Sequence, residues 1–163
     1  MTTTSGTQVG IIGAGPAGLL LSHLLHLHGI SSVVLETRDR EYVQHRVRAG
    51  VLEHGTAEIL REAGVGERMD REGLPHGGIE LRFDGAGHRL PMAGLTGRHI
   101  TVYGQQEVVK DLLERRIADG GDVYFGVSDV GIDGVGTDRP VISYTRDGRT
   151  HELACDVIAG CDG

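Results

Sequence analysis

The feature that most constrains the fold is a glycine-rich segment near the start of the chain. An apolar run, Gln8–Ile12, leads directly into Gly13-Ala14-Gly15-Pro16-Ala17-Gly18, and a leucine-rich segment follows. Three glycines at this spacing, between a strand and a helix, are typical of a turn that binds a dinucleotide. The first glycine permits a sharp turn, the second lets a pyrophosphate approach the backbone, and the third lets the helix lie close to the sheet.

Pro16 and Glu36 support the same interpretation. Proline suits the first position of a helix, where the N–H has no partner, and the positive end of the helix dipole would face the pyrophosphate. Glu36 follows the expected strand Ser32–Leu35, at the interval of a carboxylate that binds ribose hydroxyls. The sequence therefore predicts a Rossmann-like α/β fold with a parallel sheet. The motif alone leaves NAD and FAD open as ligands, and a tight turn without a ligand is the alternative.

An arginine cluster follows the second expected strand, within Thr37–Arg48. The chain has a net charge of −7, so a local group of guanidinium groups suits phosphate, which they hold through paired hydrogen bonds. An ordinary solvated loop is the alternative. The cluster consists of Arg38, Arg40, Arg46 and Arg48.

Composition argues against several other functions. The acidic net charge and the lack of a basic block argue against nucleic acid or anionic membrane as partners. The apolar helix expected at Pro16–His28 is too short to span a bilayer, so we expect a cytoplasmic protein. Cys155 and Cys161, about 20 Å apart on an extended strand, cannot form a disulfide. We expect both to be small buried residues in the reduced state.

Hydrophobic periodicity predicts the remaining elements. In the first helix we expect Ser22, His23 and His26 on the solvated side, with no bound metal. Alternation predicts two antiparallel hairpins, each closed by a turn that contains Asp-Gly. The expected helices are Val51–Ala63, Gly66–Glu72 and Gln105–Asp119, the last with an apolar stripe of Val108, Val109, Leu112, Leu113 and Ile117. The expected strands are Ile79–Phe83 with His88–Leu90, His99–Tyr103, Val123–Phe125, Val141–Thr145 with Glu152–Cys155, and a separate buried strand, Val157–Ala159.

Four stretches taken together resemble the single-component FAD-dependent aromatic hydroxylases. They are Gly13–Leu21, Arg46–Glu53 (RVRAGVLE), Thr101–Gln105 (TVYGQ) and Asp156–Gly163 (DVIAGCDG). The resemblance spans essentially the whole chain, and the second and third stretches are far more specific than the glycine turn. It implies that FAD, and not NAD, occupies the turn, with NADPH or NADH as the reductant.

The resemblance also implies roles for individual residues. The glycine segment, including Pro16 and Ala17, would bind the FAD pyrophosphate, and Glu36 would bind the adenosine ribose. The implied contacts nearer the flavin are Arg46, Arg48, Ala49, Gly50, Val51, Gln105 and Asp162.

The reductant and the proton path are implied in the same way. The loop Thr37–Tyr42, which includes Arg38, corresponds with Arg46 to the region that meets NAD(P)H. The family's arginine–glutamine pair for a 2′-phosphate is replaced here by Thr37-Arg38, so NADPH and NADH both stay open. His76 resembles the histidine that ends a proton relay from the substrate phenol to solvent, which is chemistry suited to an imidazole. A simple turn residue is the alternative for His76.

The activity implied is hydroxylation of 4-hydroxybenzoate to 3,4-dihydroxybenzoate with O2, through a flavin hydroperoxide. The sequence stops within the second FAD fingerprint, so residues 1–163 are expected to form the incomplete N-terminal part of the FAD-binding domain. Residues 78–103 would start the β-sheet layer on the substrate side, and the substrate domain would be absent. We expect this chain alone to be inactive and the full-length protein to be a homodimer. The alternatives are another phenolic substrate, a non-catalytic FAD-binding fragment, and an NAD-dependent dehydrogenase.

Overall fold

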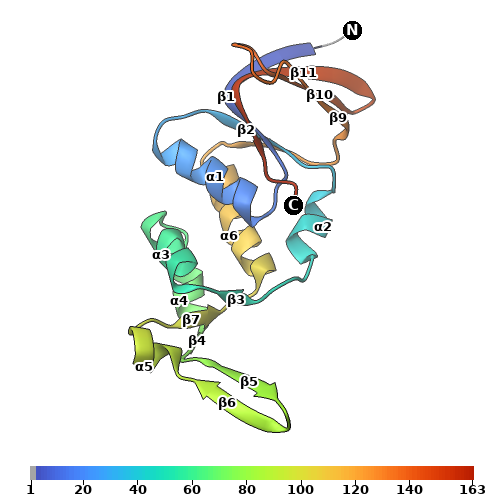
Figure 1. Cartoon of the computed structure of the whole chain (residues 1–163). Coiled ribbons are helices and arrows are strands. Elements are labelled where there is room, and N and C mark those ends of the chain that lie inside the picture. The colour runs from blue at the N-terminus through green and yellow to red at the C-terminus, as the bar shows by residue number, and fades with distance from the viewer. Residues whose placement is uncertain (1–2) are drawn as a thin grey trace. The chain divides into compact units, whose positions relative to one another are not determined.

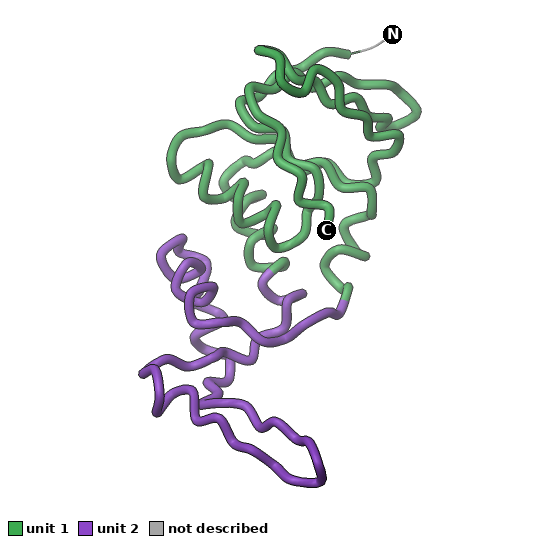
Figure 2. Tube along the Cα trace, viewed as in Figure 1, with its two compact units in different colours: residues 1–46, 109–163 green, residues 47–108 purple. Residues whose placement is uncertain are grey.

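The computed structural model describes residues 3–163, and the chain divides into two compact units (Figure 2). The first unit comprises residues 1–46 and 109–163, and the second comprises residues 47–108. Among residues 3–163, no helix combines the length and the apolar character needed to cross a bilayer.

The first unit is built on a six-stranded sheet (Figure 1). Its strand order is β8-β2-β1-β11-β10-β9, and β8, β2, β1 and β11 run parallel, while β10 is antiparallel to both neighbours. The expected α/β fold with an antiparallel addition is therefore confirmed. The strands are β1 (Thr3–Ile12), β2 (Ser32–Leu35), β8 (Asp122–Tyr124), β9 (Ser128–Asp133), β10 (Val141–Arg146) and β11 (Arg149–Gly160).

One strand prediction was wrong in its boundaries, and one strand was missed. Val157–Ala159 is not a separate buried strand: it is the end of the 12-residue β11, and Val157 is 57% exposed. β11 is continuous because it pairs with the full length of β1 on one side and with β10 on the other. Strand β9 was not expected at all, since its apolar residues alternate with glycine and aspartate and give a weak signal.

The helices of the first unit are α1 (Pro16–Leu27), α2 (Arg40–His45) and most of α6 (Gln105–Ala118). Pro16 stands at the start of α1, and Gly29 follows the helix with a φ of +71°, as expected for a left-handed stop. Helix α2 lies within the charged segment for which no helix was predicted. The Asp39 carboxylate caps it by accepting a hydrogen bond from the Tyr42 amide at 2.7 Å.

A buried polar cluster joins α1 to α6, and it corrects the prediction for α1. Ser22 and His23 are fully buried instead of solvated, and only His26 is exposed. The Ser22 hydroxyl shares a 2.9 Å hydrogen bond with Ser32 on β2 and accepts one from Arg116 Nε at 3.0 Å. Burial lowers the pKa of Arg116. The Ser22 and Ser32 hydroxyls and Arg116 Nε can be buried because they bond to one another, which a hydrophobicity pattern does not register.

Asp119, next to this cluster, gives the fold a predicted acid sensitivity. Arg115 Nε donates a 2.9 Å hydrogen bond to Asp119 Oδ2, and ring nitrogens of His26 and His23 lie 3.7 and 3.8 Å from that oxygen. The Arg115 hydrogen bond is the main reason that the pKa of Asp119 is lowered, and burial opposes it. A carboxyl with a lowered folded-state pKa stabilises the fold above its unfolded pKa, and this contribution is lost as pH falls through the folded value.

We therefore expect the melting temperature to drop as the pH falls below about 4, where an unfolded aspartate begins to bind protons. Asp119→Asn should make that drop shallower, because the substituted side chain cannot titrate. Thermal melts followed by circular dichroism from about pH 6 down to about pH 2.5 measure the effect. Asp138→Asn is the control, since Asp138 is exposed and forms no ion pair within residues 3–163. Equal slopes for Asp119→Asn and the unsubstituted chain would contradict the prediction.

The second unit contains two small antiparallel sheets. One has the order β3-β7-β4, and the other is the hairpin β5-β6, whose turn at Asp84-Gly85 has positive φ at both positions. The expected helix Val51–Ala63 is wrong at its start, because Val51 and Leu52 pair with β7 and the helix begins only at His54. The elements are β3 (Val51–Leu52), α3 (His54–Glu62), α4 (Glu67–Glu72), β4 (Leu74–His76), β5 (Ile79–Phe83), β6 (Ala86–Leu90), α5 (Met92–Thr96) and β7 (Ile100–Val102).

Candidate nucleotide-binding site

The glycine turn joins β1 to α1 in the first unit, and two of its glycines are required by geometry. Gly13 has a φ of +107°, and a Cβ there would overlap the carbonyl of Cys161. A Cβ on Gly18 would overlap the Gly13 carbonyl oxygen and lie 3.3 Å from the Cys161 side chain. The close approach of helix to sheet that was predicted for Gly18 is therefore present. Backbone bonds fix the turn: the Gly13 amide donates to the Leu35 carbonyl, and the Cys161 amide donates to the Ile12 carbonyl, both at 2.7 Å.

Gly15 differs from these two glycines because nothing in the fold requires it. Its backbone is extended, with a φ of −74°, and a Cβ would find no atom within 4 Å. Helix α1 begins at this point without a side-chain cap, so its first amides are available to an outside acceptor. An open approach next to uncapped amides and the positive end of a helix dipole fits a pyrophosphate group. The residues present thus fit the phosphate part of a dinucleotide.

Glu36 lies directly after β2 and is half-buried. Its Oε2 accepts a 2.9 Å hydrogen bond from the Ala14 amide within the glycine turn, and its Oε1 accepts one of 2.8 Å from the Arg38 amide. The structure therefore places the predicted ribose-binding carboxylate against the turn that would hold the adjoining phosphates.

The charged segment after Glu36 presents guanidinium groups that lack acid partners. The guanidinium carbons of Arg38 and Arg46 lie 5.2 and 5.6 Å from the centre of the Tyr42 ring. Within residues 3–163, neither these two arginines nor Arg40 forms an ion pair, and all three are exposed. Cation–π contacts hold a guanidinium in place and leave its N–H groups available. The segment can therefore receive an anion from solvent.

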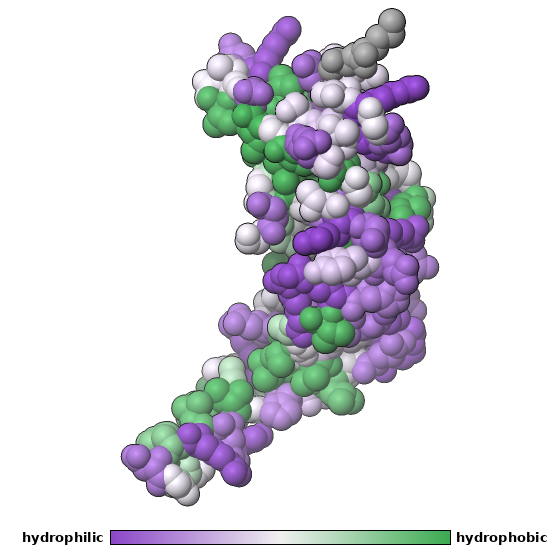
Figure 3. Space-filling view, turned by 90° about the vertical axis from the view of Figure 1, so that its right-hand side faces the viewer, coloured by the Kyte–Doolittle hydropathy of each residue, from purple (hydrophilic) through white to green (hydrophobic). Residues whose placement is uncertain are grey.

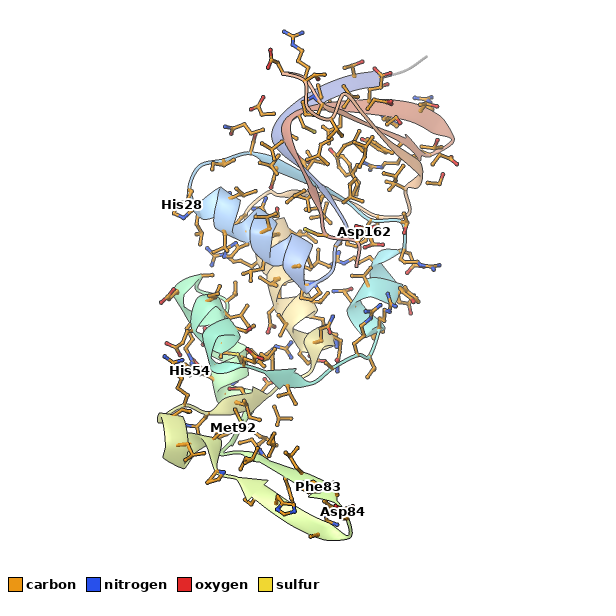
Figure 4. All side chains as sticks on the ribbon, viewed as in Figure 1. His28, His54, Phe83, Asp84, Met92 and Asp162 are labelled. Atoms are coloured by element: carbon orange, nitrogen blue, oxygen red, sulfur yellow. The ribbon has the colours of Figure 1, made fainter. Side chains whose placement is uncertain are left out.

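Asp162 is brought to the glycine turn from the far end of the sequence. A Cβ on Gly13 would lie 2.9 Å from the Asp162 amide nitrogen, and Figure 4 shows Asp162 after the end of β11. The neighbouring Cys161 is half-buried and free, and burial raises the pKa of its thiol. Cys155 is buried and free as predicted. The contact of Cys161 with Gly13 and Gly18 was not predicted. The signal that could have indicated it is the resemblance of the stretch Asp156–Gly163 to the hydroxylase family.

The second unit gathers a separate group of the predicted flavin-side residues. The Gln105 amide donates to the Ala49 carbonyl and the Tyr103 amide donates to the Gly50 carbonyl, both at 2.9 Å. Val51 is exposed and pairs with Val102. The backbone of residues 49–51 is thus fixed beside the start of α6. Arg48 is exposed at the beginning of this segment.

His76 lies elsewhere in the same sheet. It ends β4, faces Ile100 across the pairing with β7, and is exposed. Because β7 lies between β3 and β4, His76 and Val51 are on opposite sides of the central strand. Within residues 3–163, no group of histidine, cysteine and acidic residues could hold a metal ion.

Together, the parallel sheet, the glycine turn, the uncapped helix and Glu36 define a dinucleotide-binding domain. Comparison with known families makes the class specific: an FAD-binding domain model matches residues 6–163, and the chain belongs to that family. It resembles the FAD-binding part of FAD-dependent aromatic hydroxylases. The alternative of an NAD-dependent dehydrogenase is thereby set aside.

Individual relatives support this assignment. The chain is 43% identical over 161 residues to p-hydroxybenzoate hydroxylase of Acinetobacter baylyi. The aligned region covers 98% of the chain and 40% of the relative. It is 37% identical over 70 residues to phenol 2-monooxygenase of a Pseudomonas species, covering 43% of the chain and 11% of the relative. The crystal structure of p-nitrophenol 4-monooxygenase from Pseudomonas putida matches with a TM-score of 0.83 at 22% identity, covering 99% of the chain and 42% of that structure. The last match bears on the fold alone. In all three cases the chain spans less than half of the relative's length.

Proposed function

We propose that this chain is the FAD-binding part of a monooxygenase that hydroxylates 4-hydroxybenzoate to 3,4-dihydroxybenzoate with NAD(P)H and O2. The observation that carries the proposal is the 43% identity with p-hydroxybenzoate hydroxylase over almost the whole chain. The stretches Arg46–Glu53 and Thr101–Gln105 add support, since they lie outside the glycine turn that many dinucleotide-binding proteins share.

The chain's own residues would bind and orient the cofactor. Gly13–Gly18 would hold the FAD pyrophosphate, Glu36 the ribose, and Asp162 the part of FAD beside the turn. In the second unit, Arg48, the backbone of residues 49–51 and Gln105 would contact the flavin, supported by the bonds that fix Ala49 and Gly50. Bound FAD would supply the redox chemistry, by which NAD(P)H provides electrons and O2 is activated.

The arginine segment would receive the reductant. Arg38 and Arg46 on the Tyr42 ring, together with the backbone from Thr37, are proposed to meet NAD(P)H. Their unpaired guanidinium groups favour a phosphate, and a 2′-phosphate would use the paired N–H groups of an arginine. NADPH is thus the reductant that these side chains suit better, with NADH as the alternative.

His76 is proposed to pass the substrate's phenolic proton to solvent. A phenolate is richer in electrons than a phenol at the ring carbon next to the oxygen, so removal of the proton favours hydroxylation there. An imidazole exchanges protons readily near neutral pH. The exposure of His76 at the end of β4 supports a role at the solvent end of a relay.

Residues 78–103 are proposed to start the sheet layer on the substrate side. Ile79, Leu81 and Phe83 alternate along β5 and are 39%, 46% and 56% exposed. Hydrophobic surface is visible on this hairpin in Figure 3, and Phe83 is labelled in Figure 4. A two-stranded hairpin is marginally stable in water by itself. An uncovered apolar strand face is therefore suited to packing against further polypeptide of the full-length protein.

The test of the proposed function is substrate-stimulated oxidation of NAD(P)H by a full-length version of the protein. We expect stimulation by 4-hydroxybenzoate, formation of 3,4-dihydroxybenzoate, and little stimulation by benzoate, which has no phenolic proton. Phenol and 3-hydroxybenzoate complete the series. Stimulation by another phenol without stimulation by 4-hydroxybenzoate would replace the proposed substrate by that phenol.

A second candidate is a non-catalytic FAD-binding fragment, favoured by the limited coverage of the relatives. We expect the 163-residue chain to retain FAD weakly or not at all through purification and to form no hydroxylated product. Product formation by this chain alone would exclude the fragment hypothesis. The homodimer and the cytoplasmic location expected from the sequence stay predictions.

A further inference from the structure

Glu36 makes more contacts than a ribose ligand needs. One carboxylate oxygen holds the Ala14 amide of the glycine turn, and the other holds the Arg38 amide at the start of the arginine segment. The Thr37 hydroxyl adds a longer contact of 3.4 Å to the oxygen that holds Arg38. A single side chain thus connects the proposed FAD phosphate site to the proposed reductant segment.

The backbone around Glu36 is fixed independently of its side chain. The Glu36 amide donates to the Tyr124 carbonyl at 2.8 Å, and the Glu36 carbonyl accepts from the Val127 amide at 3.1 Å. Arg38 has fewer anchors: its amide donates to the Glu36 carboxylate, and its carbonyl accepts from the Gly126 amide at 3.0 Å. Loss of the carboxylate contact would therefore free one of the two backbone bonds that hold Arg38.

The carboxylate has capacity for all of these contacts and a ribose as well. A carboxylate offers about four lone-pair positions on its two oxygens. The two backbone amides use one position on each oxygen, and the longer Thr37 hydroxyl contact uses a second position on Oε1. One position on Oε2 is left for a ribose hydroxyl. Ribose binding therefore does not compete with the bonds to Ala14 and Arg38, and it restrains the same side chain.

We propose that Glu36 is a positioning residue for the arginine segment as well as a ribose ligand, so that FAD binding and ordering of Arg38 are coupled. The FAD part of this inference rests on the proposed function. A first ligand that orders a shared group lowers the ordering cost for the second, and the coupling is reciprocal. FAD should thus order the segment that meets the reductant, and a phosphate bound at that segment should strengthen FAD binding.

Amide hydrogen exchange of the 163-residue chain, followed by NMR, measures the coupling directly. A glutamine side chain has one acceptor oxygen for the two backbone amides, so Glu36→Gln should lose one of the two hydrogen bonds. In the FAD-free chain, the amide of Arg38 or of Ala14 should therefore exchange about fivefold faster, which is the effect of losing one hydrogen bond. Glu36→Asp keeps the charge and should act in the same way, since the shorter side chain cannot reach both amides. Glu152→Gln is the matched control and should leave both exchange rates unchanged, since the Glu152 side chain is exposed and forms no hydrogen bond or ion pair within residues 3–163.

Titration with FAD gives the second result. At saturating FAD, shown by a shifted Gly15 amide signal, the Arg38 amide of the unsubstituted chain should exchange about fivefold more slowly, and that of Glu36→Gln should not change. Under the same saturating FAD, adenosine 2′,5′-bisphosphate should bind more weakly to Glu36→Gln than to the unsubstituted chain. If charge alone acted, removal of an anion beside the arginines would tighten that binding.

The outcomes separate this inference from the proposed function. FAD binding without any slowing at Arg38 overturns the coupling and leaves the FAD function in place. If FAD does not bind to the 163-residue chain, the coupling to FAD is overturned for this chain, and the assay of the full-length protein still tests the proposed function. In that case the exchange rates of the FAD-free variants decide the positioning role: unchanged rates at both Arg38 and Ala14 in Glu36→Gln overturn it.

Discussion

Gly18→Ala is expected to destabilise the first unit by about 2–4 kcal/mol, whereas Gly15→Ala should leave its stability within about 0.5 kcal/mol. The two residues share one turn, but their surroundings differ. A methyl group on Gly18 would overlap the Gly13 carbonyl and press on Cys161, so the helix would have to move away from the sheet. A methyl group on Gly15 would enter open space on backbone that any residue adopts.

Gly15→Ala should instead weaken FAD binding, by about tenfold or more, because its methyl group would occupy the approach of the pyrophosphate. Urea unfolding measures the stability of both variants, and quenching of flavin fluorescence measures FAD affinity. The pair thus separates a glycine that the fold requires from one that the ligand requires. An unfolding midpoint of Gly15→Ala as low as that of Gly18→Ala would contradict this division, as would unchanged FAD affinity of Gly15→Ala.

The part of the fold that follows from local sequence was predictable. Strand β2, helix α1 after Pro16 and both Asp-Gly hairpin turns depend on residues adjacent in the sequence, and all were anticipated. The two turns contain Asp84-Gly85 and Asp147-Gly148, and all four residues have positive φ. An Asp-Gly sequence predicts such a turn because both residue types tolerate positive φ.

The errors arose where distant residues decide the outcome. Ser22 looked solvated by its polarity, yet Ser32 and Arg116 satisfy its hydroxyl in the interior. Val51 looked helical by its spacing, yet β7 supplies a strand partner for it. A periodic pattern shows which residues of an element share a face, but it does not show which distant residues contact them. Where such distant contacts decide burial or strand pairing, a prediction from the pattern is wrong.

The candidate site was predictable only in part for the same reason. Gly13, Gly18 and Glu36 lie within one local motif, and the structure brings them together as the motif implies. The approach of Cys161 and Asp162 to Gly13 depends on β11 pairing with β1, and no local pattern indicates that pairing. The contact of Glu36 with Arg38 is equally invisible to spacing, because it depends on the side chain turning back onto its own loop.

The second large effect is expected in helix α6, where the predicted apolar stripe was wrong at its C-terminal end. The predicted apolar stripe contained both Leu112 and Ile117, but Leu112 is fully buried whereas Ile117 is 43% exposed. In its place the neighbouring Arg116 is buried, with only 4% of its surface exposed and its Nε bonded to Ser22. Ile117, at the end of the predicted stripe, therefore faces away from the core. The position in the core is occupied by Arg116, which bonds to Ser22.

Leu112→Ala should consequently destabilise the protein by about 2–5 kcal/mol, through lost apolar burial and the cavity that remains. Ile117→Ala, in the same helix and with the same small gain in helix propensity, should cost less than about 1 kcal/mol. Urea unfolding followed by far-ultraviolet circular dichroism compares the two, with the transition of the first unit fitted separately because the chain has two compact units. Equal losses would restore the simple stripe and remove Arg116 from the interior. A large loss confined to Leu112 would show that the buried face of α6 includes Leu112 and excludes Ile117, as the burial of Arg116 against Ser22 requires.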